Sequence, residues 1–134
     1  MDSTLSYSKD DAFTVEGKFE LPYKYFAGRV GSKFLIALRD EKKIMGIKCS
    51  KCNKVFVPPR SVCEQHISEK CSEWVALSGT GIVTGFTVIR YKEHYQPCEP
   101  PYILALIKLD GADSALAHMI KSISHEKMRI GMRV

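Results

Sequence analysis

The sequence predicts a mainly β protein with a short N-terminal helical region, a small zinc ribbon and a C-terminal barrel of the OB type. Cysteines cluster between residues 49 and 71 at the spacing of a metal-stapled ribbon. Runs of β-branched and aromatic residues, separated by turns rich in glycine and proline, follow from residue 74 onwards. The clearest helical periodicity stands before the cysteines. We therefore divide the chain into an arm and helix (1–43), a zinc ribbon (44–73) and an OB-type domain (74–134).

The cysteine spacing is the most specific signal in the chain. Two residues separate Cys49 from Cys52, so one tight turn aims both sulfurs at the same point. A second pair, brought in by a returning hairpin, completes the tetrahedron of a structural Zn²⁺ site, with roughly 2.3 Å per Zn–S bond. Apolar runs at 44–48 and 54–57 flank the first pair and predict two short strands. We predict that Zn²⁺ is bound by Cys49, Cys52, Cys63 and Cys71.

The fourth metal ligand has an alternative. His66 stands three residues after Cys63, and a Cys₃His site is chemically as sound as a Cys₄ site. We prefer Cys71, because a fourth thiol near the other three is harder to attribute to chance than one histidine in a polar loop. Iron in the same tetrahedron of thiolates would instead make the ribbon an electron carrier. The remaining alternatives are free thiols or disulfides, and an odd count of five cysteines disfavours disulfides.

Composition and the N-terminal sequence indicate a cytoplasmic protein. Residues 1–15 carry early acidic residues and no apolar core, so they do not resemble a secretory signal. Clustered cysteines in a reducing compartment usually bind metal. The longest apolar run, 102–107, is far shorter than the roughly 20 residues of a membrane helix. We expect no association with a membrane.

The net charge of +5 is unevenly distributed. Six basic residues fall within a stretch that contains no Asp or Glu: Lys42, Lys43, Lys48, Lys51, Lys54 and Arg60. Such a block suits an anionic partner, whether a phosphorylated cofactor, a nucleic acid or an acidic protein surface. The alternative is that these side chains are solvated and offset the negative charge of a zinc–thiolate centre.

An apolar and aromatic cluster precedes the predicted helix. It consists of Phe19, Leu21, Pro22, Tyr23, Tyr25 and Phe26. Aromatic side chains are enriched at the centres of protein interfaces, so we expect Tyr23, Tyr25 and Phe26 to bind a partner protein. The alternative is that they pack over the helix at 31–43, for which Ser32 is the expected N-cap.

From residue 74 the pattern changes to that of strands. We predict strands at 74–77, 82–91 and 102–109, with a bend or bulge at Gly85. Residues 115–123 are compatible with a short helix or an interrupted strand. Short strands, bulge glycines and the lack of crossover helices favour a small OB-type barrel over a doubly wound sheet.

Several motifs occur together in a characteristic order and spacing. They are GIKCSKC at 46–52, VPPRSVC at 57–63, EWVALSGTG at 73–81, GFTV at 85–88, PY at 101–102 and RIGMRV at 129–134. In this combination the chain resembles the zinc-ribbon and OB-fold accessory proteins that accompany thiolases and other acyl-CoA enzymes. The resemblance covers about residues 25–134. It implies an N-terminal helical piece, a rubredoxin-like zinc ribbon and a C-terminal OB domain.

The resemblance also implies a function. Members of this family bind thiolase-like or hydratase-like subunits that act on acyl-CoA, and they lack the catalytic residues themselves. We therefore expect a thiolase-like large subunit as partner and an acyl-CoA shared with it. The stretch 28–48 is most similar to members that serve anaerobic toluene degradation, whose thiolase cleaves benzoylsuccinyl-CoA. The expected role is to support the partner's active conformation and the binding of CoA.

The chain departs from the family pattern at two places. Where the family usually has a second CxxC, this chain has Cys63 and His66, which leaves the choice between His66 and Cys71 open. The GMRV motif usually opens a last barrel strand, and here it stands at 131–134. A barrel short of that strand would expose an unpaired edge. We expect either further residues or a sheet that is completed in another way.

We predict no catalytic residue in this chain. Cys98 lies in a proline-rich loop four residues from His94, but no oxyanion site accompanies them. A zinc ion with four protein ligands also has no open position for a reactive water.

Basic residues near the ribbon are candidates for binding CoA, since CoA carries phosphates on an adenosine. We select Lys42, Lys43 and Arg60. The alternative function is a nucleic-acid-binding module, in which the OB domain would stack bases on Phe86 and Tyr91. We do not favour it, because aromatic residues are sparse in the strands and the basic block lies in the ribbon.

Overall fold

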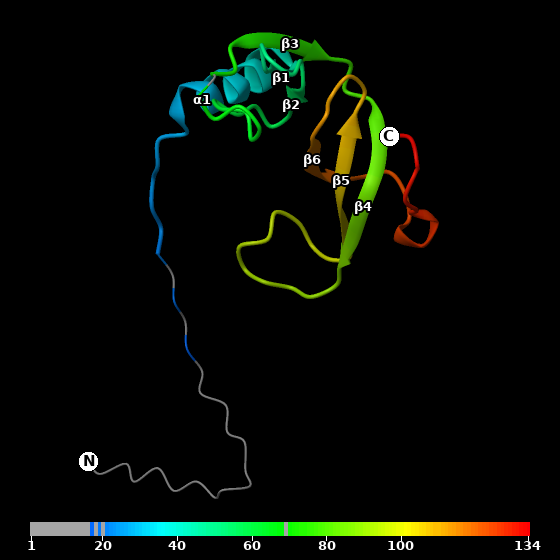
Figure 1. Ribbon diagram of the computed structural model, residues 1–134. Coiled ribbons are helices and arrows are strands. Elements are labelled where there is room, and N and C mark those ends of the chain that lie inside the picture. Colours follow the sequence, from blue (N-terminus) through cyan, green and yellow to red (C-terminus); the bar gives the residue numbers. More distant parts are fainter. Residues whose placement is uncertain (1–16, 18, 20, 69) are drawn as a thin grey trace, which may run out of the picture.

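The computed structural model describes residues 17, 19, 21–68 and 70–134, so most of the predicted arm lies outside the described residues (Figure 1). The helices and strands, in chain order, are α1 (Gly28–Ile36), η1 (Ala37–Glu41), β1 (Ile44–Lys48), β2 (Val55–Phe56), β3 (Glu73–Leu77), β4 (Gly81–Ile89), β5 (Tyr102–Leu109), β6 (Ala115–Ile120) and η2 (His125–Lys127). They form two three-stranded sheets, ordered β2-β1-β3 and β4-β5-β6. The predicted mainly β fold with one short helical region is confirmed.

The helix begins three residues earlier than the sequence predicts. Its N-cap is Ala27, no side chain caps it, and Ser32 lies inside it, so the N-cap prediction was wrong. Gly28 has a φ of 75°, a conformation that favours glycine, and this lets the chain turn into the helix there. The π-helical turn η1 continues α1 and is capped at its C-terminal end by Lys42, whose φ is 56° and whose N–H donates to the carbonyl of Ala37.

The first sheet forms the ribbon. Its central strand, β1, pairs antiparallel with β2 on one side and with β3 on the other. The pairing with β3 runs from Ile44 opposite Leu77 to Lys48 opposite Glu73. The strand predicted at 74–77 therefore belongs, by its hydrogen bonds, to the sheet of the ribbon. It leads directly from that sheet into β4.

The second sheet follows the alternation that its sequence predicts. In β5, Ile103, Ala105, Ile107 and Leu109 are buried and the residues between them are exposed. The register between β4 and β5 shifts between Val83 and Gly85, which confirms the predicted irregularity at Gly85. Residues 115–120 pair with β5 as β6, so the ambiguous segment is a strand.

The end of the chain extends this sheet by a short pairing with β4. The N–H groups of Gly81 and Val134 each donate to the other residue's carbonyl, at 2.9 and 3.0 Å. The N–H of Val83 also donates to the carbonyl of Met132 at 2.9 Å. Within the part of the chain that the structure describes, the strands form an open OB-type sheet and do not close into a barrel.

One core joins the helix, the ribbon and the second sheet. Phe34 of α1 and Val57 after β2 are buried in the same cluster as Val83 and Ile103 of the second sheet. Backbone and side-chain bonds reinforce this contact. The N–H of Val55 donates to Asp113 Oδ2 at 2.8 Å, and the N–H of Asp113 donates back to the carbonyl of Val55 at 2.8 Å. The ribbon is therefore fixed to the loop between β5 and β6.

Gly81 lies where a side chain has no room. A Cβ atom there would lie 2.5 Å from the carbonyl oxygen of Lys108 and 2.9 Å from the Cα of Leu109, both of them backbone atoms. We predict that Gly81→Ala lowers the free energy of unfolding by about 1–3 kcal/mol, as other overpacked sites do. The matched control is Gly85→Ala, because a Cβ at Gly85 meets nothing within 4 Å. Equal effects of both variants in urea denaturation would contradict the close packing at Gly81.

A salt bridge holds the C-terminal segment and depends on pH. Arg133 donates to both carboxylate oxygens of Asp110 at 2.7 Å, and Thr80 Oγ1 donates to the same carboxylate at 2.8 Å. These bonds lower the pKa of Asp110 from 3.8 to about 2. Because the folded pKa is depressed, this stabilisation is present above about pH 4 and is lost as the pH falls towards about 2.

We therefore predict that the difference in free energy of unfolding between the wild type and Asp110→Asn shrinks as the pH falls from about 4 to about 2. Arg133→Gln should reduce this pH dependence as well, since it removes the main donor. Stability curves of wild type and Asp110→Asn that stay parallel over this range would show that the salt bridge contributes nothing.

Candidate metal centre

The first half of the metal centre is a tight turn after β1. The N–H of Cys49 donates to the carbonyl of Lys54 at 2.9 Å, and the N–H of Asn53 donates to the carbonyl of Cys49 at 2.9 Å. Asn53 has a φ of 60°, a left-handed conformation that asparagine tolerates well. This turn places Cys49 and Cys52 on the same side, as their spacing predicts.

The second half is a hairpin that returns beside the first turn. A β-bridge joins Val62 to Lys70, and the N–H of Cys71 donates to the carbonyl of Ser61 at 3.0 Å. At the start of this hairpin, the N–H of His66 donates to the carbonyl of Cys63 at 3.3 Å. Cys63 and His66 have the same spacing in this turn as Cys49 and Cys52 have in the first.

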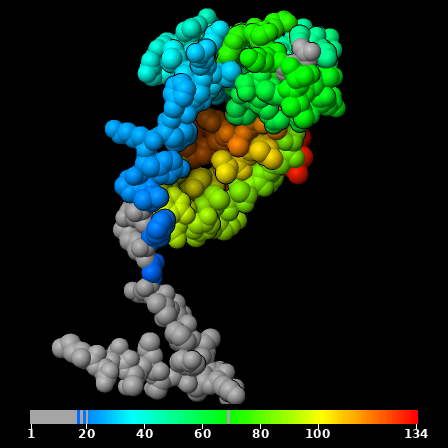
Figure 2. Space-filling model, turned by 60° about the vertical axis from the view of Figure 1, so that its left-hand side comes forward, coloured from blue at the N-terminus to red at the C-terminus, as the bar shows by residue number. Residues whose placement is uncertain are grey.

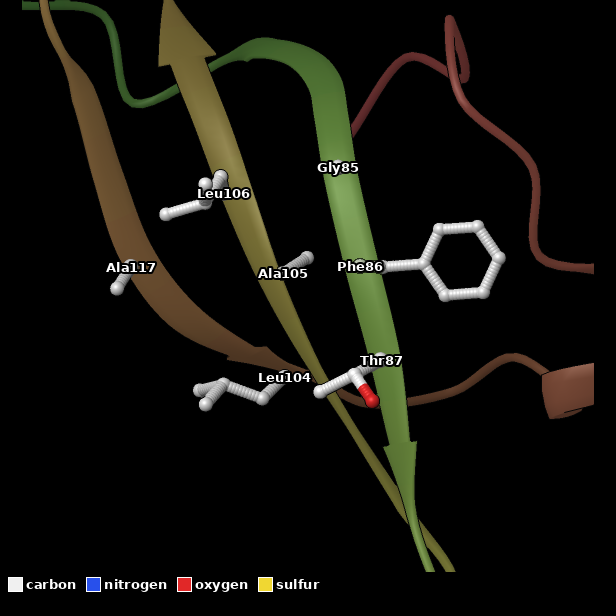
Figure 3. A pocket seen from close by; sticks show the side chains of 7 residues that line it. All are labelled: Gly85, Phe86, Thr87, Leu104, Ala105, Leu106 and Ala117. Carbon is white, nitrogen blue, oxygen red and sulfur yellow. The ribbon is translucent and has the colours of Figure 1, made fainter.

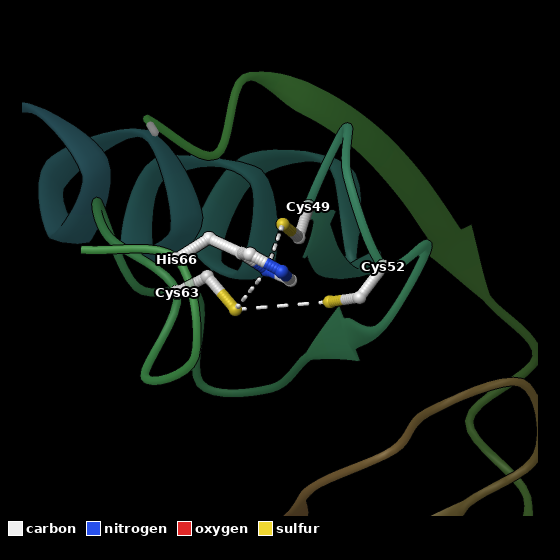
Figure 4. A group of neighbouring side chains, drawn as sticks. All are labelled: Cys49, Cys52, Cys63 and His66. Atoms are coloured by element: carbon white, nitrogen blue, oxygen red, sulfur yellow. Dashed lines mark hydrogen bonds between the residues drawn. The ribbon is translucent and has the colours of Figure 1, made fainter. Parts of the chain in front are cut away.

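Four possible ligand atoms meet between the two turns. The atoms come from Cys49, Cys52, Cys63 and His66, and all lie within 4.8 Å of one another (Figure 4). Cys52 Sγ and Cys63 Sγ are 3.7 Å apart. Nδ1 of His66 lies 3.7 Å from Cys49 Sγ and 3.6 Å from Cys63 Sγ.

These separations fit a tetrahedral metal site. For bonds of roughly 2.3 Å to sulfur and 2.0–2.1 Å to nitrogen, a tetrahedron has S–S edges of roughly 3.8 Å and S–N edges of roughly 3.6 Å. The three measured edges match these values closely. The cluster therefore has the donor set of a metal site, three sulfurs and one nitrogen, and matches its geometry along these three edges.

Cys71, the preferred fourth ligand in the sequence analysis, lies outside this group of four. It is buried beside the group, with 6% of its surface exposed. Burial, followed by the charges of Cys49 and Cys63, raises the pKa of Cys71. Of the two possible fourth ligands, the structure brings His66 into the group with the other three.

The backbone around the first turn favours a thiolate at Cys49. Hydrogen bonds from the backbone of Cys52 are the main reason why the pKa of Cys49 falls to about 6, and burial opposes them. A donor from the backbone of Lys54 also lowers the pKa of Cys52, but burial and the neighbouring thiols raise it by more. The turn therefore supports, at Cys49, the negative charge that a metal ligand needs.

The ligands belong to a small apolar cluster of their own. Cys49, Cys63 and Cys71 are buried together with Ile47 and Phe56. Such a cluster is too small to hold a ribbon together by apolar burial alone, and ribbons of this kind take much of their stability from a bound metal. The metal ligands are therefore also the main structural element of this half of the molecule.

The three basic residues selected for CoA binding make different local contacts. Lys42 Nζ donates to the backbone carbonyl of Arg39 at 2.6 Å, and Lys43 pairs with Glu41 at 2.9 Å, so both are engaged at the end of their own helix. Arg60 lies over the ring of Phe56, with 5.3 Å between its guanidinium carbon and the ring centroid.

The aromatic residues in the described part of the arm are exposed. Tyr23, Tyr25 and Phe26 expose 75%, 78% and 80% of their surface, so they do not pack over the helix. The rings of Tyr23 and Tyr25 lie 6.0 Å apart between centroids. Figure 2 shows the described part of the arm, in blue, running from the helix along one side of the molecule.

The loop between β4 and β5 holds the residues that were considered for catalysis. Cys98 Sγ contacts Met119 Sδ of β6 at 3.7 Å, and His94 lies edge-on to Tyr95 with 5.4 Å between ring centroids. These contacts place the thiol of Cys98 against the sheet.

The exposed face of the second sheet has a shallow apolar hollow of about 260 Å³ (Figure 3). Its lining consists of Gly85, Phe86, Thr87, Leu104, Ala105, Leu106 and Ala117. Phe86 is the one aromatic side chain in this lining, and no lysine or arginine belongs to it. A groove that binds single-stranded nucleic acid needs both cations and several stacking rings.

Among the described residues, no helix is long and apolar enough to cross a membrane.

The fold and the site together define a metal-binding ribbon followed by an OB-type domain. Family models match both parts: the rubredoxin-like zinc ribbon domain of ChsH2 over residues 37–73 and the C-terminal OB-fold domain of ChsH2 over residues 74–134. The two matches adjoin and together cover residues 37–134. The chain therefore belongs to the ChsH2 family of zinc-ribbon and OB-fold proteins.

Known relatives of similar length support this membership. A DUF35 domain-containing scaffold protein of Methanocaldococcus jannaschii is 26% identical over 97 residues, which are 72% of this chain and 68% of that protein. The Ltp2–ChsH2(DUF35) aldolase structure is similar with a TM-score of 0.64 and 25% identity, over 79% of this chain and 80% of that one. A DUF35 family protein of unknown function from Sulfolobus solfataricus gives a TM-score of 0.62 and 28% identity, over 78% and 74%.

Two variants separate the possible fourth ligands. We predict that His66→Ala loses most of its bound metal and that Cys71→Ser retains about one metal ion per chain. Cys49→Ser should behave as His66→Ala does and should also lose the ordered ribbon. Metal content is measured by mass spectrometry of the elements, and folding by circular dichroism. Loss of metal from Cys71→Ser alone would reverse the assignment.

Proposed function

We propose that this protein is a non-catalytic, zinc-containing accessory subunit of a thiolase-type enzyme that cleaves a 3-oxoacyl-CoA. The observation that carries the proposal is the closed four-ligand metal site within a ChsH2-type ribbon and OB fold. A closed site has a structural role, because it leaves no position for a substrate or a reactive water. The relatives support an accessory role, since one is named a scaffold protein and another forms an aldolase with Ltp2.

The metal that suits the cluster best is Zn²⁺, bound by Cys49, Cys52, Cys63 and His66. Structural zinc sites commonly combine three cysteines with one histidine. Iron in a rubredoxin-type site would need four thiolates, whereas the proposed ligand group has three thiols and the ring nitrogen of His66. Bound zinc would stabilise the ribbon as a folded unit. Cys71, buried next to Cys49, would then donate its S–H to a metal-bound thiolate.

The arm is the part of the chain that we assign to docking. Tyr23, Tyr25 and Phe26 are exposed, large and close together, and such side chains supply much of the binding energy of interfaces. The large subunit would carry the nucleophilic cysteine and the acyl pocket. The substrate that the sequence resemblance favours is benzoylsuccinyl-CoA, with the acyl group held by that partner.

A cytoplasmic location fits the same picture. No disulfide joins any of the five cysteines in the structure, and clustered cysteines without disulfides are typical of reducing compartments. A nucleic-acid-binding function is less well supported, since the exposed face of the OB sheet offers one aromatic ring and no cation in its hollow.

We predict that the tagged protein, purified from its native cell in moderate salt, retains a thiolase-type protein in fixed ratio. Replacing Tyr23, Tyr25 and Phe26 by alanine together should lower the recovered partner at least about tenfold. The matched control is Tyr95→Ala, which removes an equally exposed ring from the loop between β4 and β5. Recovery of nucleic acid without such a protein would contradict the proposed function.

A further inference from the structure

A basic cavity lies beside the metal ribbon, where the start of α1 meets the segment that follows β2. Its volume is about 630 Å³, within the usual range for small-molecule sites. The residues that line it are Ala27, Gly28, Arg29, Val30, Gly31, Pro59, Arg60, Ser61, Val62 and Lys70. Three separate segments therefore contribute to one hollow, and each of them supplies a cation.

The three cations have little to neutralise them. The described lining contains Arg29, Arg60 and Lys70 and no acidic side chain. Among the residues that the structure describes, Arg29 and Lys70 have no ion-pair partner. Arg60 contacts Glu64 at 3.4 Å, a long and exposed pair that stabilises little. The cavity therefore has a concentrated positive charge that an anion would neutralise.

The remaining groups in the cavity also suit an anion. Ser61 contributes a hydroxyl to the lining, and hydroxyl groups donate readily to phosphate oxygens. The ring of Phe56 lies under the guanidinium of Arg60 and restricts its position. An arginine held in this way is prepared for the two parallel hydrogen bonds that it forms with phosphate.

We propose that this cavity binds a phosphate monoester, and specifically the 3′-phosphate of CoA, through Arg29, Arg60 and Lys70. The choice of CoA rests on the proposed function, and the choice of phosphate rests on the cavity itself. A hollow lined by three cations from three segments suits one doubly charged group. A nucleic-acid strand would instead need an extended basic track with stacking rings, and no aromatic residue lines this cavity.

The direct test compares CoA with 3′-dephospho-CoA as ligands of the full, metal-loaded chain in isothermal titration calorimetry. CoA should bind at one site, and removal of its 3′-phosphate should weaken binding at least about tenfold. Arg29→Gln and Lys70→Gln should each weaken the binding of CoA and abolish the difference between the two ligands. The matched controls, Arg39→Gln and Lys92→Gln, remove the same charges from exposed positions outside the cavity and should bind as the wild type does.

Several results would overturn the assignment. These are the absence of CoA binding, equal affinity for the two ligands, or unchanged binding in both cavity variants. Tighter binding of an oligonucleotide, lost in the same two variants, would assign the cavity to nucleic acid instead. The same two variants, Arg29→Gln and Lys70→Gln, should still co-purify with the thiolase-type partner. This measurement tests the proposed function separately from the phosphate site. If CoA does not bind but the partner is retained, only the phosphate site is wrong.

Discussion

The geometry of four ligand atoms between two turns is the constraint on which the rest of this molecule depends. The first turn follows β1 and the second opens the returning hairpin, so a shared metal fixes the distance between them. Trp74 of β3 then packs against both the metal-side cluster and the main core, with Lys33 of α1 over its ring at 4.6 Å. The bonds between Val55 and Asp113 fix the OB sheet to the same ribbon.

This arrangement lets a small chain present two surfaces, the aromatic arm and the basic cavity. A metal held by all four residues of the group would have no open position, so its binding would stabilise the fold rather than supply chemistry. The aromatic arm directly precedes α1. The basic cavity is lined by the first turn of the helix α1 and by the hairpin that carries Cys63. Docking and anion binding would thus both be organised by the element that the metal stabilises.

The parts of this structure that depend on local sequence could be predicted from it, and the parts that depend on distant contacts could not. The turn from Cys49 to Cys52, the alternation in β5 and the irregularity at Gly85 follow from neighbouring residues. The position of His66 in the metal site depends on how the hairpin folds back onto the first turn. The number of residues between the ligands does not determine that fold. Arg29 and Lys70 lie forty-one positions apart in the sequence. Only the fold shows that both line the same cavity and add positive charge to it. In the sequence, Arg29 and Lys70 are visible only as basic residues outside the block at 42–60.

X-ray absorption spectroscopy of the purified protein at the zinc edge tests the central claim most directly, because it reports the element and its ligands together. A Cys₃His site predicts three sulfur neighbours at roughly 2.3 Å and one nitrogen neighbour at roughly 2.0–2.1 Å. A shell of four sulfurs would place Cys71 in the site and remove His66 from it. A protein that folds fully without bound metal would contradict the view that the metal holds the ribbon together.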